Sequence, residues 1–268
     1  MAIRISKRFL DRAKKHLRHY QRILGEAQSR DVNESDTVVI VSDMLADIFG
    51  YDKYADVTTE FCIRSTFCDL AVKVNGQARF LIEVKSIGTD LKANHLRQAV
   101  DYGAKQGTEW VILTNGAIWQ AHRIKFDKPI DSDEVFTLDL LDPSVKTAEL
   151  LIKLHLLSKE ASSNAEIGKY WMQKEATSRF VLAQLFMDDD ILRTLRRELR
   201  AISSDVKVSV EDLRDLVRNE VIKRELLEGD KAASAEALVR KAARRQARAK
   251  SVTTTAEQTA TSASGTPG

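Results

Sequence analysis

The stretch Phe67-Cys-Asp69-Leu-Ala-Val-Lys-Val-Asn-Gly-Gln-Ala-Arg-Phe-Leu-Ile-Glu83-Val-Lys85 decides the fold of this chain. Apolar side chains recur at every second position on either side of Asn75-Gly76, which is typical of two half-buried β-strands joined by a turn. Both apolar rows must face one core, so the pairing has to set even positions against even positions. The rows are Leu70, Val72 and Val74, then Phe80, Ile82 and Val84.

The length of the turn fixes this register. A two-residue turn at Asn75-Gly76 is the usual interpretation of that dipeptide, but it would pair Val74 with Gln77 and put the apolar rows on opposite faces. A three-residue loop from Val74 to Gly76, with Gly76 as a left-handed bulge, pairs Lys73 with Gln77 and keeps the rows together. The sequence therefore predicts the three-residue loop.

The same register brings polar residues together. It puts Asp69 on the face of Glu83 and Lys85, directly across from Leu81. Carboxylate oxygens are the ligands that Mg²⁺ prefers, and a bound metal lowers the pKa of a water near a phosphodiester. A lysine can stabilise charge that builds on the phosphate. The alternative interpretation is an ordinary hairpin with a solvated charged face.

Composition sets the broad class. The chain has 268 residues, of which 43% are hydrophobic and 30% charged, enough for one α/β domain and a helical appendage. The two cysteines, Cys62 and Cys68, match no zinc or disulfide pattern, so we expect buried residues of a reduced, cytoplasmic protein. The N-terminus lacks the apolar stretch of a signal peptide, and no apolar run is long enough to span a membrane.

The order of predicted elements describes a mixed β-sheet flanked by helices. Helices are expected at 6–28, 34–49 and 91–106, and strands at 56–64, 67–74, 78–85, 110–114, 118–126 and 135–141. One face of the first helix carries an apolar stripe of Phe9, Ala13, Leu17, Tyr20 and Leu24. Its other face is basic and suits a phosphate backbone, with Lys7, Arg8, Arg12, Lys14, Lys15 and Arg18.

From about residue 145 the strand signals end. Charged helices with apolar stripes are expected at 145–160, 165–186, 189–203 and 209–228. We therefore divide the chain into a basic helix (1–29), an α/β domain (30–143), a helical subdomain (144–230), a basic helix (231–250) and a disordered tail (251–268). Arg244 and Arg245 on the second basic helix are candidate DNA contacts; the alternatives are a solvated face or an unfolded tail.

Five motifs occur in an order that resembles the PD-(D/E)XK nucleases. They are Glu34 at a helix start, that helix ending at Gly50, Asp69…Glu83-Val-Lys85, Gln98-Ala-Val-Asp-Tyr102, and Thr114-Asn-Gly…Trp119. The chain is especially similar to the N-terminal nuclease domain of type I restriction enzyme R subunits and to related stand-alone predicted restriction endonucleases. The resemblance covers roughly residues 30–130 and implies a restriction-endonuclease-like fold.

The resemblance implies a role for each residue of the acidic cluster. Asp69 and Glu83 would be ligands of Mg²⁺, or of Mn²⁺ in its place, with the Val84 carbonyl as a further oxygen. Lys85 would assist the nucleophile or stabilise charge on the phosphate. Glu34 would complete the cluster from its helix; the alternative for Glu34 is an acid that simply favours a helix N-terminus.

The resemblance also implies that Gln98 and Tyr102, one helical turn apart, contact DNA backbone; the alternative is an exposed helical pair. Two features depart from the family. Cys68 stands where the family name has proline. The chain also lacks the Gly-x-x-x-x-Gly-Lys-[Ser/Thr] segment of an ATP-driven motor.

Together these features predict a metal-dependent DNA endonuclease of the restriction type. The alternative is a catalytically silent or partner-dependent nuclease-fold subunit that binds DNA or acts as an adaptor. DNA is the expected partner in either case, with a homodimer or the subunits of a restriction-modification complex as possible protein partners.

Overall fold

The computed structural model describes residues 3–63, 66–205 and 207–245. The chain forms two compact units, Met1–Trp171 and Met172–Gly268. The predicted disordered tail (251–268) and the last residues of the predicted basic helix lie outside the described residues.

The first unit is built on one six-stranded sheet in which the strands lie side by side in chain order. β3 and β4 run parallel, and every other neighbouring pair is antiparallel, so the predicted α/β class with a mixed sheet is confirmed. The strands are β1 (Val57–Ile63), β2 (Thr66–Val74), β3 (Gln77–Val84), β4 (Trp110–Thr114), β5 (Ile118–Lys125) and β6 (Asp131–Asp139). The parallel step needs a crossover, which α3 (Ala93–Gln106) supplies.

The turn between β2 and β3 differs from the prediction. Asn75 and Gly76 both have positive φ, 53° and 78°, and form a two-residue turn that pairs Val74 with Gln77. The predicted three-residue loop is therefore wrong. Both central residues of such a turn must be left-handed, and Asn-Gly adopts that conformation at low cost.

The apolar rows nevertheless share one face, as predicted, because a β-bulge restores the register within the strands. The pairing shifts between Val72 and Lys73, so that Val72 lies opposite Phe80 and Leu70 opposite Ile82. All four of these apolar residues are buried in one core. The bulge was expected at the turn and lies in the ladder instead.

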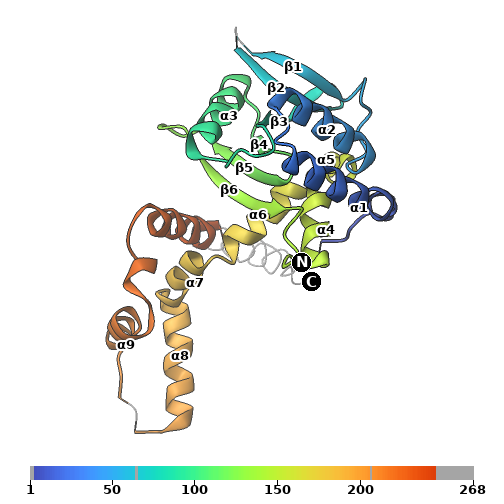
Figure 1. The fold of residues 1–268 in the computed structure, drawn as a ribbon. Helices are drawn as coiled ribbons and strands as arrows, with labels where there is room; N and C mark the ends of the chain where they lie inside the picture. The colour runs from blue at the N-terminus through green and yellow to red at the C-terminus, as the bar shows by residue number, and fades with distance from the viewer. Residues whose placement is uncertain (1–2, 64–65, 206, 246–268) are drawn as a thin grey trace, which may run out of the picture. The chain divides into compact units, whose positions relative to one another are not determined.

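Helices cover both faces of the sheet (Figure 1). The larger core joins the even-numbered apolar residues of β2 and β3 to α1 (Lys7–Ser29), α2 (Glu34–Asp47) and α4 (Thr147–Leu156). A smaller core on the other face joins Ala71, Leu81 and Val111 to α3. α3 ends at Gly107, which is left-handed with φ 74°, in agreement with the predicted helix end.

The N-terminal helix belongs to this core rather than forming a separate segment. Phe9, Ala13, Tyr20 and Leu24 are buried and Leu17 is packed against them, as the apolar stripe predicted. Its basic face is exposed at the residues Lys7, Arg8, Lys14, Lys15 and Arg18. Arg12, which was predicted to share that face, points inward.

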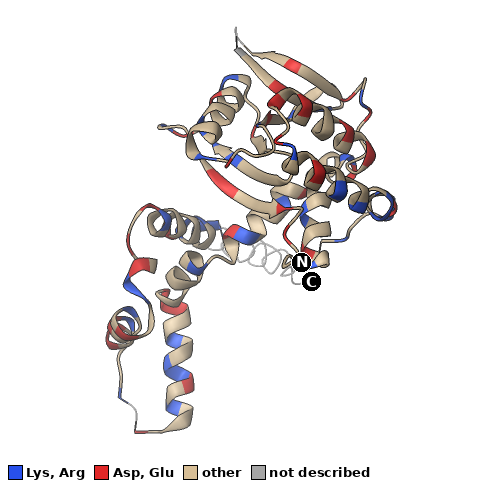
Figure 2. Cartoon of the chain, viewed as in Figure 1, with Lys and Arg blue, Asp and Glu red and all other residues tan. Residues whose placement is uncertain are grey.

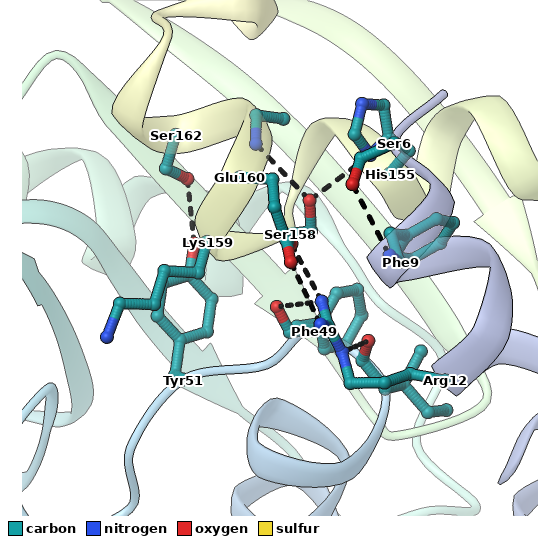
Figure 3. Close-up of polar contacts among 12 residues, drawn as sticks. Ser6, Phe9, Arg12, Phe49, Tyr51, His155, Ser158, Lys159, Glu160 and Ser162 are labelled. Carbon is teal, nitrogen blue, oxygen red and sulfur yellow. Dashed lines mark hydrogen bonds and ion pairs between the residues drawn. The ribbon is translucent and has the colours of Figure 1, made fainter. Parts of the chain in front are cut away.

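Arg12 forms a closed polar network in the first unit (Figure 3). Its guanidinium donates to both carboxylate oxygens of Glu160, at 2.9 and 2.7 Å, and to the carbonyls of Ile48 and Phe49 at 3.1 and 3.3 Å. Glu160 lies on α5 (Lys159–Ser163), so this contact joins α1 and α5 to the C-terminal end of α2. It also satisfies carbonyls that a helix end leaves without partners.

The second unit is helical. It contains the end of α6 (Glu166–Ala176), then α7 (Arg179–Phe186), α8 (Asp189–Ile202), α9 (Val210–Leu216), the π-helix η1 (Val217–Val221), the 3₁₀ helix η2 (Arg224–Leu226) and a helix over 230–245. Figure 2 shows basic residues spread along α8, with acidic ones among them. A separate apolar cluster around Leu192, Leu213 and Val217 holds α8, α9 and η1 together.

Three predicted helices are each broken in two. Ser158 caps α5 by accepting from the Ala161 amide, and Ser178 caps α7 by accepting from the Val181 amide. Serine side chains that bond to nearby amides favour a new helix start over continuation. The predicted helix over 209–228 breaks where η1 gives way to an extended Ile222.

The boundary between the compact units also differs from the division made on the sequence. It falls after Trp171, whereas strand signals end near residue 145. The difference arises because Leu150 and Leu154 of α4 are buried in the sheet core.

Cys68 is buried as expected, but Cys62 is exposed, and both are free thiols. Among the described residues, no helix combines the length and apolar character needed to cross a membrane.

Candidate functional site

The candidate site lies at the C-terminal end of β3, in the middle of the sheet. Glu83 is only 1% exposed although its side chain is ionisable. Lys85 follows the strand, and its amide donates to the Thr114 carbonyl of β4 at 2.8 Å. The parallel pairing of β3 with β4 therefore fixes the backbone that carries both side chains.

Asp69 comes from the neighbouring strand. The β2–β3 register continues from Leu70 opposite Ile82, so Asp69 lies opposite Glu83 and not opposite Leu81 as predicted. Its Oδ2 accepts from the Val84 amide at 2.7 Å. The bulge in the hairpin thus brings the two acids closer in register than the sequence indicated.

Lys85 joins the acids into one cluster. Its Nζ donates to Glu83 Oε1 at 2.7 Å and lies 3.6 Å from Glu34 Oε2. Glu34 is the first residue of α2, after the N-cap Asn33, and its side chain is 49% exposed. The structure therefore brings together the four predicted catalytic residues, three carboxyl groups with one ammonium.

The electrostatics of the cluster follow from burial. Burial raises the pKa of Glu83 to about 7, and the charges of Asp69 and Glu34 add to that effect against the hydrogen bond from Lys85. Burial likewise raises the pKa of Asp69, although the Val84 amide and Lys85 act in the opposite direction. Burial alone would lower the pKa of Lys85, but its hydrogen bond to Glu83 and the surrounding carboxylates raise it overall.

One atom of the cluster is left without a partner. Glu83 Oε2 is buried and has no hydrogen-bond partner among the described residues, whereas Oε1 is bonded to Lys85. A buried carboxylate oxygen without a partner is costly, and a cation would remove that cost. The carboxyl groups of Asp69 and Glu83, on opposed positions of neighbouring strands, thus fit a divalent metal as oxygen ligands. Over residues 3–63, 66–205 and 207–245, no group of three His, Cys, Asp or Glu side chains could hold a metal ion.

The Thr114-Asn115-Gly116 segment supports the cluster from the next strand. Asn115 donates through Nδ2 to the carbonyls of Ile87 and Thr89, at 3.2 and 3.1 Å. Thr114 Oγ1 donates to the Ile118 carbonyl at 2.7 Å and accepts from the Gly116 amide. These bonds tie the loop after Lys85 to the turn between β4 and β5, which is a positioning role.

Gln98 and Tyr102 lie on α3 as predicted, one turn apart. Gln98 Nε2 donates to Tyr102 Oη at 2.9 Å. Gln98 is exposed, and Tyr102 packs in part against the smaller core. No described contact links either residue to Asp69, Glu83 or Lys85, so the structure pairs them with each other and not with the acidic cluster.

Arg244 and Arg245 lie in the second unit, on the exposed surface of the helix over 230–245. They are therefore not part of the site described in the first unit. Neither residue has a hydrogen bond or ion pair within the described part of the chain.

Sequence reasoning missed one residue beside the site. The β1–β2 register pairs Thr59 with Leu70 and Phe61 with Cys68, which sets Glu60 opposite Asp69. Glu60 has a left-handed backbone, φ 47°, which is uncommon for a residue other than glycine. Glu60 is exposed and makes no described contact with Asp69 or Glu83, so only its backbone position in the register relates it to the site.

No protein-family model, curated protein or solved structure matches this chain in the comparisons made. The likeness to PD-(D/E)XK nucleases therefore rests on the order of motifs in the sequence and stays a prediction.

Proposed function

We propose that the first unit is a metal-dependent DNA endonuclease that hydrolyses phosphodiester bonds. One observation carries the proposal: Glu83 is a buried carboxylate whose Oε2 has no partner, while its Oε1 is bonded to Lys85 and Asp69 lies opposite. A purely structural ion pair has no reason to gather further carboxylates around an unpaired oxygen. Such groups are common at functional sites.

Three residues of the cluster, Glu83, Lys85 and Glu34, would each have a role in the reaction. Glu83 Oε1 holds the Lys85 ammonium in place, so its positive charge is oriented before substrate binds. Lys85 keeps its proton on Nζ, because the carboxylates around it raise its pKa, and can stabilise charge on the phosphate. Glu34, half exposed at 3.6 Å from Lys85, can reorient when DNA approaches.

The proposed metal is Mg²⁺, with Mn²⁺ able to replace it. Asp69 and Glu83 would hold it, with the Val84 carbonyl as a further oxygen. The ion would supply a water of lowered pKa and charge stabilisation at the scissile phosphate. Burial raises the pKa of Asp69 and Glu83 in the metal-free protein, and a bound cation would lower both by favouring the ionised forms.

Cleavage of supercoiled plasmid tests the proposal. We expect nicking that requires Mg²⁺ or Mn²⁺ and falls by on the order of a hundredfold to a thousandfold in Glu83→Gln and Lys85→Ala. Glu109→Gln is the matched control, since Glu109 makes a 2.7 Å ion pair with Arg123 in the same unit, away from the cluster. It should cut at the wild-type rate.

Two other outcomes would change the assignment. If Glu83→Gln cuts as fast as wild type, the acidic cluster is not the active site. If no sample cuts but the protein still retains DNA at low salt, the alternative of a silent or partner-dependent DNA-binding subunit replaces the endonuclease.

A further inference from the structure

A cavity of about 910 Å³, half open to solvent, lies wholly within the second unit and shares no residue with the acidic cluster. Its walls come from the end of α7, from α9 through η2, and from the helix over 230–245. A cavity of this size is in the range that holds a small organic ligand. Its lining therefore indicates what such a ligand would be.

Arginine is the prominent residue of the lining. Arg214, Arg218, Arg224 and Arg240 all reach the cavity. Three of them are held in ion pairs: Arg224 with Glu228 at 2.6 Å, Arg240 with Glu236, and Arg214 with Asp189. The side chain of Arg218 has neither a hydrogen bond nor an ion pair within the described part of the chain.

The charge balance sets the size of the anion that would fit. Glu228, Glu236 and Asp189 already neutralise three of the lining arginines, which leaves the charge of Arg218 without an ion pair in the described part of the chain. That charge matches a single phosphate group better than a polyanion. A path along a duplex would instead need a run of unpaired cations, one for each neutralised phosphate.

The backbone at Arg218 is unusual. Arg218 and Asn219 lie in the π-helix η1, which closes through a bond from the Ile222 amide to the Val217 carbonyl at 2.9 Å. The wider turn lets Arg218, Asn219 and Ile222 line the same cavity. Single π-turns of this kind are often found at functional sites.

The rest of the lining is apolar. Met187, Ile222, Leu227, Val239 and Ala243 contribute aliphatic surface next to the arginines. A ligand with one phosphate and one flat, weakly polar body would satisfy both parts. The guanidinium of Arg218 would bind the phosphate through two parallel hydrogen bonds, and the aliphatic surface would cover the flat body of the ligand.

We propose that this cavity binds one phosphate-bearing nucleotide unit, with Arg218 as the principal phosphate contact. The unit could be a free nucleotide or one nucleotide of a single strand, since the recognised chemistry is the same. The proposal holds whether or not the first unit cuts DNA.

Titration of the full chain tests the proposal, with deoxyadenosine 5′-monophosphate and a short fluorescent single-stranded DNA as separate probes. The Glu83→Gln variant, without divalent metal, is the host, so that cleavage does not affect the result. We expect Arg218→Gln to weaken binding by more than about tenfold, because a hydrogen bond to a charged group is lost. Arg200→Gln is the matched control, since Arg200 is exposed on α8 and does not line the cavity.

A second variant tests whether lost binding results from the cavity itself and not from loss of structure. Ala243→Trp fills the cavity without removing a charge, and it should weaken binding of the same probe while circular dichroism stays unchanged. Binding of both probes would identify a free-nucleotide site, and binding of the strand alone would identify a nucleic-acid contact. Absence of binding to the unaltered host, or equal loss in Arg218→Gln and Arg200→Gln, would overturn the proposal.

Discussion

Two glutamates of the first unit each bind a basic side chain, yet their pKa values shift in opposite directions. Burial alone would raise the pKa of Glu160, but the hydrogen bonds from Arg12, the backbone and Ser158, together with the charge of Arg12, lower it overall. Burial raises the pKa of Glu83 to about 7 despite its hydrogen bond from Lys85. An acid bonded to a basic side chain is therefore a satisfied contact at Glu160 and an unsatisfied one at Glu83.

The difference lies in the partners of each oxygen. Arg12 donates to both oxygens of Glu160, so one cation matches one anion (Figure 3). Lys85 donates to one oxygen of Glu83, the other has no partner, and Asp69 and Glu34 add negative charge. We infer that the first contact is retained for stability and the second for chemistry.

Breaking the satisfied contact should have the largest effect on folding. Arg12→Ala leaves Glu160 without its cation and removes the donor to the carbonyls of Ile48 and Phe49. We expect the free energy of unfolding to fall by about 3 kcal/mol, measured by urea denaturation. DNA cleavage per folded molecule should not change, because Arg12 makes no described contact with the acidic cluster.

The control for this variant is Arg123→Ala. The Arg123–Glu109 pair is 36% and 40% exposed at its two side chains, so its loss should cost less than about 1 kcal/mol. If the two variants lose equal stability, the Arg12 network is not the stabilising element inferred here.

Removing the charge of Glu83 should raise the free energy of unfolding, whereas Arg12→Ala should lower it. In the folded state its pKa is about 7, above the ordinary value of 4.5, so the folded protein keeps a proton that the unfolded chain releases between these values. Stability of the metal-free protein should therefore fall as pH rises through this window and level off above it. Glu83→Gln should be more stable than wild type by up to about 3 kcal/mol at alkaline pH and nearly equal to it at acidic pH.

Thermal unfolding in EDTA across the pH range measures this difference. Lys85→Met is the companion variant, since it removes the one cation bonded to Glu83 and should steepen the pH dependence. A wild-type protein whose stability does not vary between pH 4.5 and 7 relative to Glu83→Gln would contradict a raised pKa at this residue.

The smallest effect is expected at His155, near the satisfied contact. Burial lowers its pKa, although Glu166, 3.2 Å from Nε2, and Glu160 act in the opposite direction, while Arg12 acts with burial. As the pH falls below 6.5, the unfolded chain therefore binds a proton at His155 more readily than the folded protein does. The free energy of unfolding should fall with the pH. His155→Gln should remove about 1 kcal/mol of this acid dependence, seen in melting temperature, with no effect above neutral pH.

Much of the fold follows from local patterns. The alternation on both sides of Asn75-Gly76 predicted that the apolar rows of β2 and β3 share one face, and they do. The stripe on α1 and the helix end at Gly107 are likewise as predicted. These features depend on side chains a few residues apart, which a sequence displays directly.

Other features depended on partners distant in the chain. The sequence did not indicate that Arg12 would turn inward, because Glu160 lies 148 residues away. It also assigned α4 to a separate helical subdomain, whereas Leu150 and Leu154 fill the core of the sheet. Amphipathic helices look alike whether they cover their own unit or another.

The sequence by itself determined which residues could form an acidic site, since the period of a strand puts Asp69, Glu83 and Lys85 on one face. The tertiary structure alone decided how they meet. A bulge between Val72 and Lys73 set Asp69 opposite Glu83, and the packing around β3 buried Glu83 with one oxygen unpaired. The physical reason is that alternation is local, whereas register and burial depend on how the strands and helices pack together.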